Sequence, residues 1–355
     1  MIFSGVRMSE GTKIEWCDYT FNPWIGCTKV SPGCANCYAE SQDKFRSWTP
    51  EGWGKGKPRK RTTKANWQGP RKWQKKILAA QLLQSEQSGF GSYSLLQKPR
   101  VFCASLADWL DAEVPVEWLV DLLSLIEDTQ GLDWLLLTKR PENWELRMLL
   151  AHRMADEKGL TWICQLLENW LHGDAPENVW IGTSVEDQRR ADERVPELIQ
   201  IPAVVRFLSV EPMLGPVDLS SPRLATCGVQ NNFVSPGCLS SGPLHWVICG
   251  GESGPGARPF ALEWADDLRR QCESSGAAFF MKQIGARPYL ENVNLWSDGY
   301  IAALEACRCL VDPPAAVGGA ASAGITPWDK KGGDVNQWPP KLRVRKFPNQ
   351  EGLSE

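Results

Sequence analysis

The stretch LDWLLLTKRPENWELRMLLAHRMA, residues 132–155, contains the structural unit from which the fold is built. A short apolar run is followed by polar residues and then by a segment with apolar side chains at helical spacing. An uninterrupted apolar strand joined to a helix is typical of parallel sheets, whose strands are buried on both faces. The stretch therefore predicts one strand–helix unit of an α/β fold.

The same order of strand, polar end and helix recurs along most of the chain. About seven strands compose either an open doubly wound sheet or a partial or complete parallel βα barrel. Polar residues follow six consecutive strands, and in a barrel such positions meet at one mouth, so the pattern favours the barrel. The strands are predicted within residues 14–24, 100–108, 132–140, 178–187, 203–212, 245–254 and 277–285.

The residues at the carboxyl ends of these strands are the candidates for binding and catalysis. Polar side chains also mark where strands simply stop, and that interpretation stays open for single positions. Adjacent charges such as Lys139 and Arg140 are explained less well by it, so they favour a site. The candidates are Ser105, Asp108, Lys139, Arg140, Glu186, Glu211, Gly250, Gly251 and Glu252.

The barrel is predicted to span residues 12–290, and a C-terminal extension to span 291–355. The barrel contains a basic insertion at about 51–75 and a loop insertion at about 221–243. The extension contains a flexible linker at about 310–325, which is rich in Pro, Gly and Ala. Its last polar segment either adds an edge strand or closes over the mouth of the barrel.

The overall charge of the chain does not indicate a nucleic-acid or membrane partner. The 355 residues contain 39 Lys plus Arg and 42 Asp plus Glu, a net charge of −3. The apolar runs are far shorter than the ~20 residues of a membrane-spanning helix, and the first residues lack the apolar stretch of a signal peptide. We therefore expect a cytoplasmic protein without a membrane partner.

One local patch departs from this balance. Residues 51–75 read EGWGKGKPRKRTTKANWQGPRKWQK, in which Lys and Arg alternate with Trp53, Trp67 and Trp73. Cations interleaved with flat aromatic rings are what a phosphate backbone and unstacked bases favour, which predicts a nucleic-acid partner. The alternative is a solvated loop whose tryptophans dock on the domain.

Three cysteines stand close together in GCTKVSPGCANCY, residues 26–38. Thiolates at such spacing are most often metal ligands. No second CxxC follows, and no histidine stands at ligand spacing, so a zinc finger or ribbon fits poorly. Cys27, Cys34 and Cys37 instead suit an iron–sulfur cluster with one open iron position. A plain dithiol at Cys34 and Cys37 would leave Cys27 without a role.

The other cysteines fall into two groups. Those in apolar strand or helix patterns are interpreted as small hydrophobic side chains. Those in loop-like sequence are open to interpretation as metal ligands, as redox pairs or as residues without a role. The first group is Cys103, Cys164, Cys249 and Cys272; the second is Cys227, Cys238, Cys307 and Cys309.

Several blocks together resemble the phage-associated three-Cys-motif proteins, a family related to the radical S-adenosylmethionine enzymes. The resemblance runs from about residue 12 to 348 and omits the two inserts. Its blocks are TKIEWCDYTFNPWIGCTKVSPGCANCYAE, VFCASLADWLD, LLLTKRPENW, VWIGTSVED, RFLSVEPMLGP, VICGGESGPGARP, FFMKQIG and DKKGGDVNQWPPKLRVRKFP.

The resemblance implies a barrel of the radical S-adenosylmethionine type with a [4Fe–4S] cluster on Cys27, Cys34 and Cys37. The spacing here is C-x6-C-x2-C, whereas the commonest form in that superfamily is C-x3-C-x2-C. Tyr38 matches the aromatic residue that commonly stands beside the last cysteine, and the Pro-Gly pair in the first gap is expected to turn the extra residues aside.

The resemblance also implies contacts with S-adenosylmethionine. Ser105 and Asp108 are the best-placed candidates for the cofactor. Residues 250–252, GGE, resemble the glycine-rich segment that receives the methionine amino group, although they follow a later strand than usual. The remaining candidates for the cofactor's carboxylate or ribose, for the substrate or for catalysis are Lys139, Arg140, Glu186 and Glu211.

Two functions follow from these patterns. The first is a radical S-adenosylmethionine enzyme that acts on a nucleic acid or another phage-relevant substrate. The second is a non-catalytic protein with a structural zinc, which binds a partner protein encoded in the same phage or defence operon. The sequence leaves the reaction and the substrate open.

Overall fold

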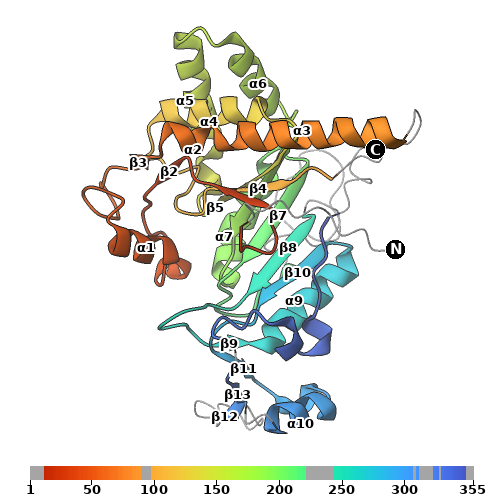
Figure 1. Ribbon diagram of the computed structural model, residues 1–355. Helices are drawn as coiled ribbons and strands as arrows, with labels where there is room; N and C mark the ends of the chain where they lie inside the picture. Colours follow the sequence, from red (N-terminus) through yellow and green to blue (C-terminus); the bar gives the residue numbers. More distant parts are fainter. Residues whose placement is uncertain are drawn as a thin grey trace. The chain divides into compact units, whose positions relative to one another are not determined.

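The computed structural model describes residues 12–88, 97–220, 244–306, 309–311, 323–327 and 329–348. The predicted loop insertion at 221–243, with Cys227 and Cys238, lies outside these ranges, as does Cys307. Figure 1 shows the helices and strands in order along the chain.

The central element is a seven-stranded parallel sheet whose strands follow one another in chain order. All seven predicted strands are present in it. Because β1 and β10 are its two edges, the sheet is an open, partial parallel barrel and not a closed one. Its strands are β1 (Tyr19–Phe21), β4 (Arg100–Cys103), β5 (Asp133–Thr138), β6 (Val179–Ser184), β7 (Val205–Val210), β8 (Trp246–Gly250) and β10 (Ala278–Gln283).

The strands are buried on both faces, as continuous apolar sequence predicts. All five residues of β8 and all six of β6 are buried. The pairing keeps one register from β1 to β4, from β4 to β5 and from β7 to β8. Between β8 and β10 the register shifts between Met281 and Gln283. Polar side chains follow the last residues of these buried strands. They therefore lie at the carboxyl edge of the sheet.

The chain divides into two compact units. The first contains the chain up to Lys29 together with residues 38–181 and 201–204. The second contains residues 30–37 and 182–200 and the chain from Val205 onward. The cysteine motif is therefore shared, with Cys27 in the first unit and Cys34 and Cys37 in the second. Each unit is described by itself below.

In the first unit, helices cover the strands β1, β4 and β5. The apolar spacing of α4 buries Leu119, Leu122 and Ile126 on one face. α4 contacts α5, and α5 runs beside α6 in a helical hairpin (Figure 1). The helices are α1 (Tyr38–Arg46), α2 (Lys64–Trp67), α3 (Gly69–Ser88), α4 (Val116–Glu127), α5 (Trp144–Glu157) and α6 (Thr161–Leu171).

The basic segment 51–75 is ordered against the first unit. β3 (Lys60–Arg61) pairs antiparallel with β2 (Trp24–Ile25), and α2 and the start of α3 follow. Trp67 is buried and meets Phe21 edge to face at 5.6 Å. Trp73 stacks on Tyr19 at 4.4 Å. The alternative in which the tryptophans dock on the domain therefore holds for these two rings.

In the second unit, α9 lies against β8 and β10 (Figure 1). A separate four-stranded sheet has the order β12-β13-β11-β9. The elements that complete this unit are α7 (Gln188–Gln200), β9 (Phe260–Ala261), α9 (Leu262–Ser275), β11 (Pro288–Leu290), α10 (Asp298–Ala306), β12 (Leu310–Val311) and β13 (Ala323–Ile325).

The C-terminal segment adds to the edge of β10. The Met281 amide donates to the Val344 carbonyl at 2.8 Å, and the Lys346 amide donates to the Phe279 carbonyl at 2.9 Å. Together with an antiparallel bridge between Phe280 and Arg345, these bonds agree with the first of the two arrangements expected for this segment, pairing at the sheet edge. The two ends of the predicted linker, β12 and β13, also pair with each other, while residues 312–322 lie outside the described part.

Of the four cysteines in apolar patterns, three are buried, as those patterns predict. Cys103, Cys249 and Cys272 are buried, and Cys164 is half-buried in α6. Cys309, from the group in loop-like sequence, is buried beside β12. None of the helices in the described ranges has the length and apolar character needed to cross a membrane.

Candidate functional site

The cysteine motif folds as a short turn followed by a helix. Residues 32–34 form a single turn of 3₁₀-helix, in which the Cys34 amide donates to the Ser31 carbonyl at 2.9 Å. Pro32 opens this turn, a position where its missing N–H costs no hydrogen bond. The expected turn at Pro-Gly is therefore present. Cys37 lies directly before α1, which begins at Tyr38.

In the first unit, Cys27 lies against the guanidinium of Arg140. Both terminal nitrogens of Arg140 are 3.6 Å from Cys27 Sγ, and one of them also donates to the Thr28 carbonyl at 2.6 Å. Burial raises the pKa of Cys27 to about 12, although the charge of Arg140 acts in the opposite direction. The isolated thiol is therefore neutral at pH 7 and has a cation ready to stabilise its thiolate.

Asp108 holds Arg140 in that position. Arg140 Nη1 donates to Asp108 Oδ2 at 2.7 Å, and both side chains are nearly inaccessible to solvent. Asp108 also accepts the Thr138 hydroxyl at 2.7 Å and the Lys139 and Leu110 amides at 2.9 and 3.0 Å. Both carboxylate oxygens are thus occupied by protein donors. Asp108 acts through Arg140 and joins the ends of β4 and β5.

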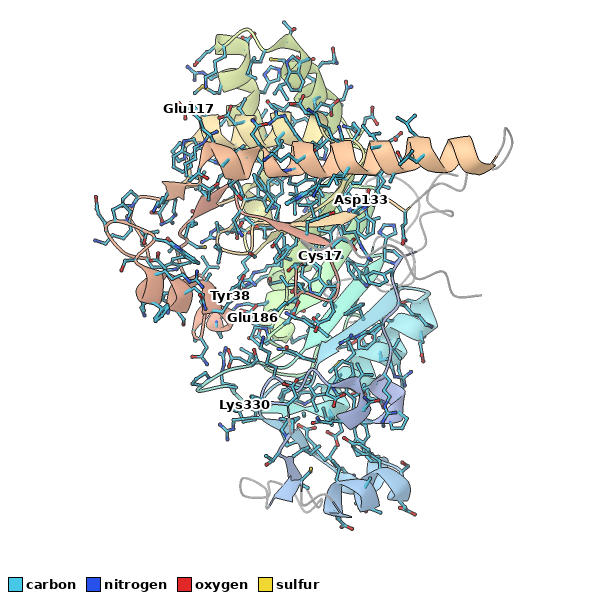
Figure 2. The ribbon with its side chains drawn as sticks, viewed as in Figure 1. Cys17, Tyr38, Glu117, Asp133, Glu186 and Lys330 are labelled. Carbon is cyan, nitrogen blue, oxygen red and sulfur yellow. The ribbon has the colours of Figure 1, made fainter. Side chains whose placement is uncertain are left out.

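Ser105 and Tyr38, two other candidates, meet in the first unit. The Tyr38 hydroxyl donates to the Ser105 carbonyl at 2.6 Å, and the Tyr38 side chain is 56% exposed. Ser105 Oγ in turn lies within hydrogen-bond distance of the Asn22 side chain. Figure 2 labels Tyr38 at the start of α1. The hydroxyl end of the Tyr38 ring is thus fixed to the segment after β4.

In the second unit, Glu186 binds the backbone of the cysteine turn. Its Oε1 accepts the Gly33 amide at 3.1 Å, and its Oε2 accepts from Arg194 at 3.0 Å. Glu186 lies just after β6, is 1% exposed and is labelled in Figure 2. A Cβ at position 33 would stand 3.1 to 3.4 Å from this carboxylate, so glycine lets the turn approach closely.

Glu252 and Arg258 bind the same turn from another strand end. Glu252 follows β8 and accepts the Asn36 amide group at 3.0 Å. Arg258 pairs with Glu252 at 2.7 Å and donates to the Pro32 carbonyl at 2.8 Å. Burial acts to raise the pKa of Glu252, but the hydrogen bonds from Arg258 and Asn36 outweigh it, so the pKa is lowered. Glu252 therefore remains ionised.

Close packing of the backbone explains one of the two glycines before Glu252. The Gly251 amide donates to the Gln283 carbonyl at 3.0 Å, which holds the end of β8 against the end of β10. A Cβ at position 251 would lie 2.7 Å from the Ile284 carbonyl oxygen, a distance that real side chains do not adopt. At Gly250 the nearest neighbours are at ordinary contact distances of 3.4 Å. Close backbone approach accounts for Gly251 without a ligand.

Lys139 and Glu211 complete the set of predicted candidates. Lys139 is half-buried in the first unit, directly after β5. Glu211 lies after β7 in the second unit, where Lys282 pairs with it at 2.6 Å. Lys282 comes from the end of β10, so this pair also joins two strand ends.

Sequence reasoning missed the side chains that hold the motif in place. Asn36, Arg194 and Arg258 carry much of that hydrogen bonding in the second unit. In the first unit, Arg59 and Asp111 form a buried pair at 2.8 Å beside Thr28. An apolar-periodic pattern carries no signal for such residues. The one sequence signal was Arg258, which stands six residues after Glu252 and could pair with its carboxylate.

The three cysteines have the donor chemistry that an iron–sulfur cluster uses. Cys34 and Cys37 are half-exposed, as ligands of a cluster open to a small molecule should be. In the part of the chain that the structure describes, no three Cys, His, Asp or Glu side chains are grouped as a metal site. A common site for the three thiols therefore stays a prediction.

An open parallel partial barrel with a cysteine motif held by its strand ends defines an α/β protein of the barrel class. Residues 11–305 match the family model described as "Protein of unknown function (DUF5131)", so the chain belongs to that family. Neither a curated protein nor a solved structure matches the chain.

Proposed function

We propose that the protein is a radical S-adenosylmethionine enzyme in which Cys27, Cys34 and Cys37 hold a [4Fe–4S] cluster. Three thiolates leave one iron open to the amino and carboxylate groups of S-adenosylmethionine. The bound cluster would supply the electron that breaks the sulfonium bond, and the protein's part is to position the reactants and exclude water.

The observation that carries the proposal is the attachment of the cysteine motif to three strand ends. Arg140 after β5 contacts Cys27, while Glu186 after β6 and Glu252 after β8 bind the turn at 32–36. Ligand sites of parallel barrels lie at the carboxyl ends of the strands. Attachment to strand ends within each unit supports a cofactor site more strongly than a surface zinc site.

The chain's own residues have defined parts in this proposal. Arg140 favours the thiolate of Cys27, which metal binding requires. Asp108 keeps Arg140 in place and, with both oxygens occupied, is a positioning residue and not a cofactor ligand. Tyr38 presents an exposed ring directly after Cys37, where it would border a bound ligand.

A nucleic-acid substrate stays part of the proposal in a narrower form. Trp67 is buried and the half-buried Trp73 stacks on Tyr19, so these rings are less open to bases than the sequence suggested. What supports a phosphate backbone as partner is a set of exposed lysines in the same segment. These are Lys55, Lys57, Lys60, Lys64, Lys72 and Lys75.

Anaerobic purification and cluster reconstitution test the proposal. The wild-type chain should hold about four iron and four sulfide per chain, and Cys27→Ala, Cys34→Ala or Cys37→Ala should each lose most of both. Cys164→Ala is the matched control, because Cys164 is half-exposed yet lies in α6, away from the motif. Iron content in this control should equal that of the wild type.

Activity gives the second readout. With dithionite and S-adenosylmethionine, the reconstituted wild type should release 5'-deoxyadenosine, and the motif variants should not. A colourless chain that stays free of iron after reconstitution overturns the proposal. One zinc per chain, lost in the motif variants, would instead support the non-catalytic metal protein.

A further inference from the structure

Arg147, on the first turns of α5, is a buried cation whose hydrogen bonds are incomplete. The residue is only 3% exposed. Among the described residues, neither its Nε nor its Nη2 has an acceptor. A guanidinium remains charged in proteins, and a buried charge without partners is strongly unfavourable. The described residues therefore leave two donors of Arg147 without the acceptors that a buried guanidinium needs.

Trp144 adds a third unpaired donor on the same helix face. Residues three apart in a helix lie above one another, and both Trp144 and Arg147 are buried. Within the described ranges the indole N–H of Trp144 also lacks an acceptor. The opposite face of α5 carries exposed apolar residues, Leu146, Leu149 and Leu150. The three groups without a partner on the buried face, the Trp144 indole N–H and two N–H groups of Arg147, are all hydrogen-bond donors.

Asp111 is the carboxylate near Arg147, but its oxygens are already occupied. Its Oδ2 accepts both Nε and Nη2 of Arg59, at 2.9 and 2.8 Å. Its Oδ1 accepts the Glu113 amide at 3.1 Å. Burial lowers the pKa of Arg147, and Asp111 only partly opposes this effect. Both oxygens of Asp111 thus already accept other donors, and Arg59 also pairs with Glu113 at 3.3 Å. Nε and Nη2 of Arg147 are left without an acceptor among the described residues.

The position of Arg147 suits a ligand. α5 begins shortly after the end of β5, and Asn143 donates to the Leu110 carbonyl at 3.0 Å. That bond ties the start of α5 to the segment after β4, in the same unit. The donors therefore lie near the carboxyl ends of two strands, where parallel folds bind ligands.

We infer that Arg147 and the Trp144 indole form a binding site for a small oxyanion, the phosphate or carboxylate group of a ligand. The planar fork of a guanidinium matches two oxygens of either group. The inference rests on Arg147 and Trp144 and does not depend on the function proposed above.

The test uses the full-length, metal-free chain in chloride, phosphate or acetate at equal pH and ionic strength. The thermal midpoint, Tm, should rise with phosphate or acetate and level off, because a ligand of the native state stabilises it by mass action. The two arms distinguish a phosphate site from a carboxylate site. Titration calorimetry with the effective anion then gives its affinity.

Two variants locate the site. Arg147→Met removes the unpaired charge, so it should match or exceed the wild-type Tm in chloride and fall below it in the effective anion, with affinity about tenfold or more weaker. Arg147→Lys keeps the charge but loses the fork, and should bind with intermediate affinity. Arg153→Met is the control on α5, where Arg153 is exposed, and should keep wild-type affinity.

Three results would overturn the inference. The first is a wild-type Tm that is the same in all three anions while Arg147→Met lowers it in each, since Arg147 would then be a structural partner of Asp111. The second is equal anion binding by the wild type and Arg147→Met. The third is a loss of affinity in Arg153→Met as large as that in Arg147→Met, which would indicate a general surface effect.

Discussion

Replacing Asp108 by Asn should weaken the fold more than almost any other change of one charge. Asp108 accepts four hydrogen bonds and is 4% exposed. Asn has a single carbonyl oxygen, so at least two of the four donors would instead face an NH₂ group. Arg140, which is 6% exposed, would lose its paired charge. Breaking a buried ion pair in this way typically costs about 3–5 kcal/mol.

Urea unfolding of the metal-free chain at pH 7 measures this cost as a change in unfolding free energy. Asp128→Asn is the matched control, since Asp128 pairs with Arg71 at the surface and such pairs contribute about 1 kcal/mol or less. Adding Arg140→Met to Asp108→Asn should recover part of the loss, because the uncompensated charge is then removed. A loss below about 1 kcal/mol, equal to the control, would refute the reasoning.

Three further predictions follow from close contacts and from shifted pKa values. Gly251→Ala should destabilise by about 1–3 kcal/mol in the same urea assay, because its Cβ would meet backbone at 2.7 Å. Gly299→Ala, with open space around it in α10, should instead stabilise slightly. Alkylation followed by mass spectrometry should find Cys27 almost unreactive at pH 8 in the metal-free chain, since a pKa of about 12 leaves about one thiol in ten thousand ionised. Glu252→Gln should cost about 1–3 kcal/mol at neutral pH, with the cost shrinking below about pH 4.5.

The sign of the last prediction follows from the lowered pKa of Glu252. A carboxyl group that is more acidic in the folded state stabilises the fold above its unfolded pKa. The contribution is lost as the pH falls through the folded pKa. A pH-independent difference between the wild type and Glu252→Gln would contradict this account. Rapid alkylation of Cys27 at pH 8, or equal effects of alanine at positions 251 and 299, would contradict the other two.

The sheet was predictable because its strands carry a local signal. Continuous apolar runs such as WLLL in β5 can be buried only between two layers, and each is followed by a helical pattern. The edge pairing of residues 344–346 was one of the two arrangements that the sequence left open for this segment. Periodicity captures what each residue does within its own strand or helix.

The contacts of the candidate site were not predictable, because they join distant parts of the chain. The Gly33 amide and Glu186 are 153 residues apart, and Asn36 and Glu252 are 216 apart. Charged residues after strands were interpreted as ligand-binding groups. The structure shows that several of them are satisfied by protein donors, and a single sequence does not separate these two uses of a carboxylate.

The pairing of residues 344–346 with β10 has a consequence for the solution behaviour of the chain. An uncovered sheet edge presents a row of unpaired amides and carbonyls, and such rows recruit strands from other molecules. The C-terminal segment occupies this row at Phe279 and Met281. A chain shortened before residue 344 would expose it and would be prone to intermolecular strand addition and aggregation.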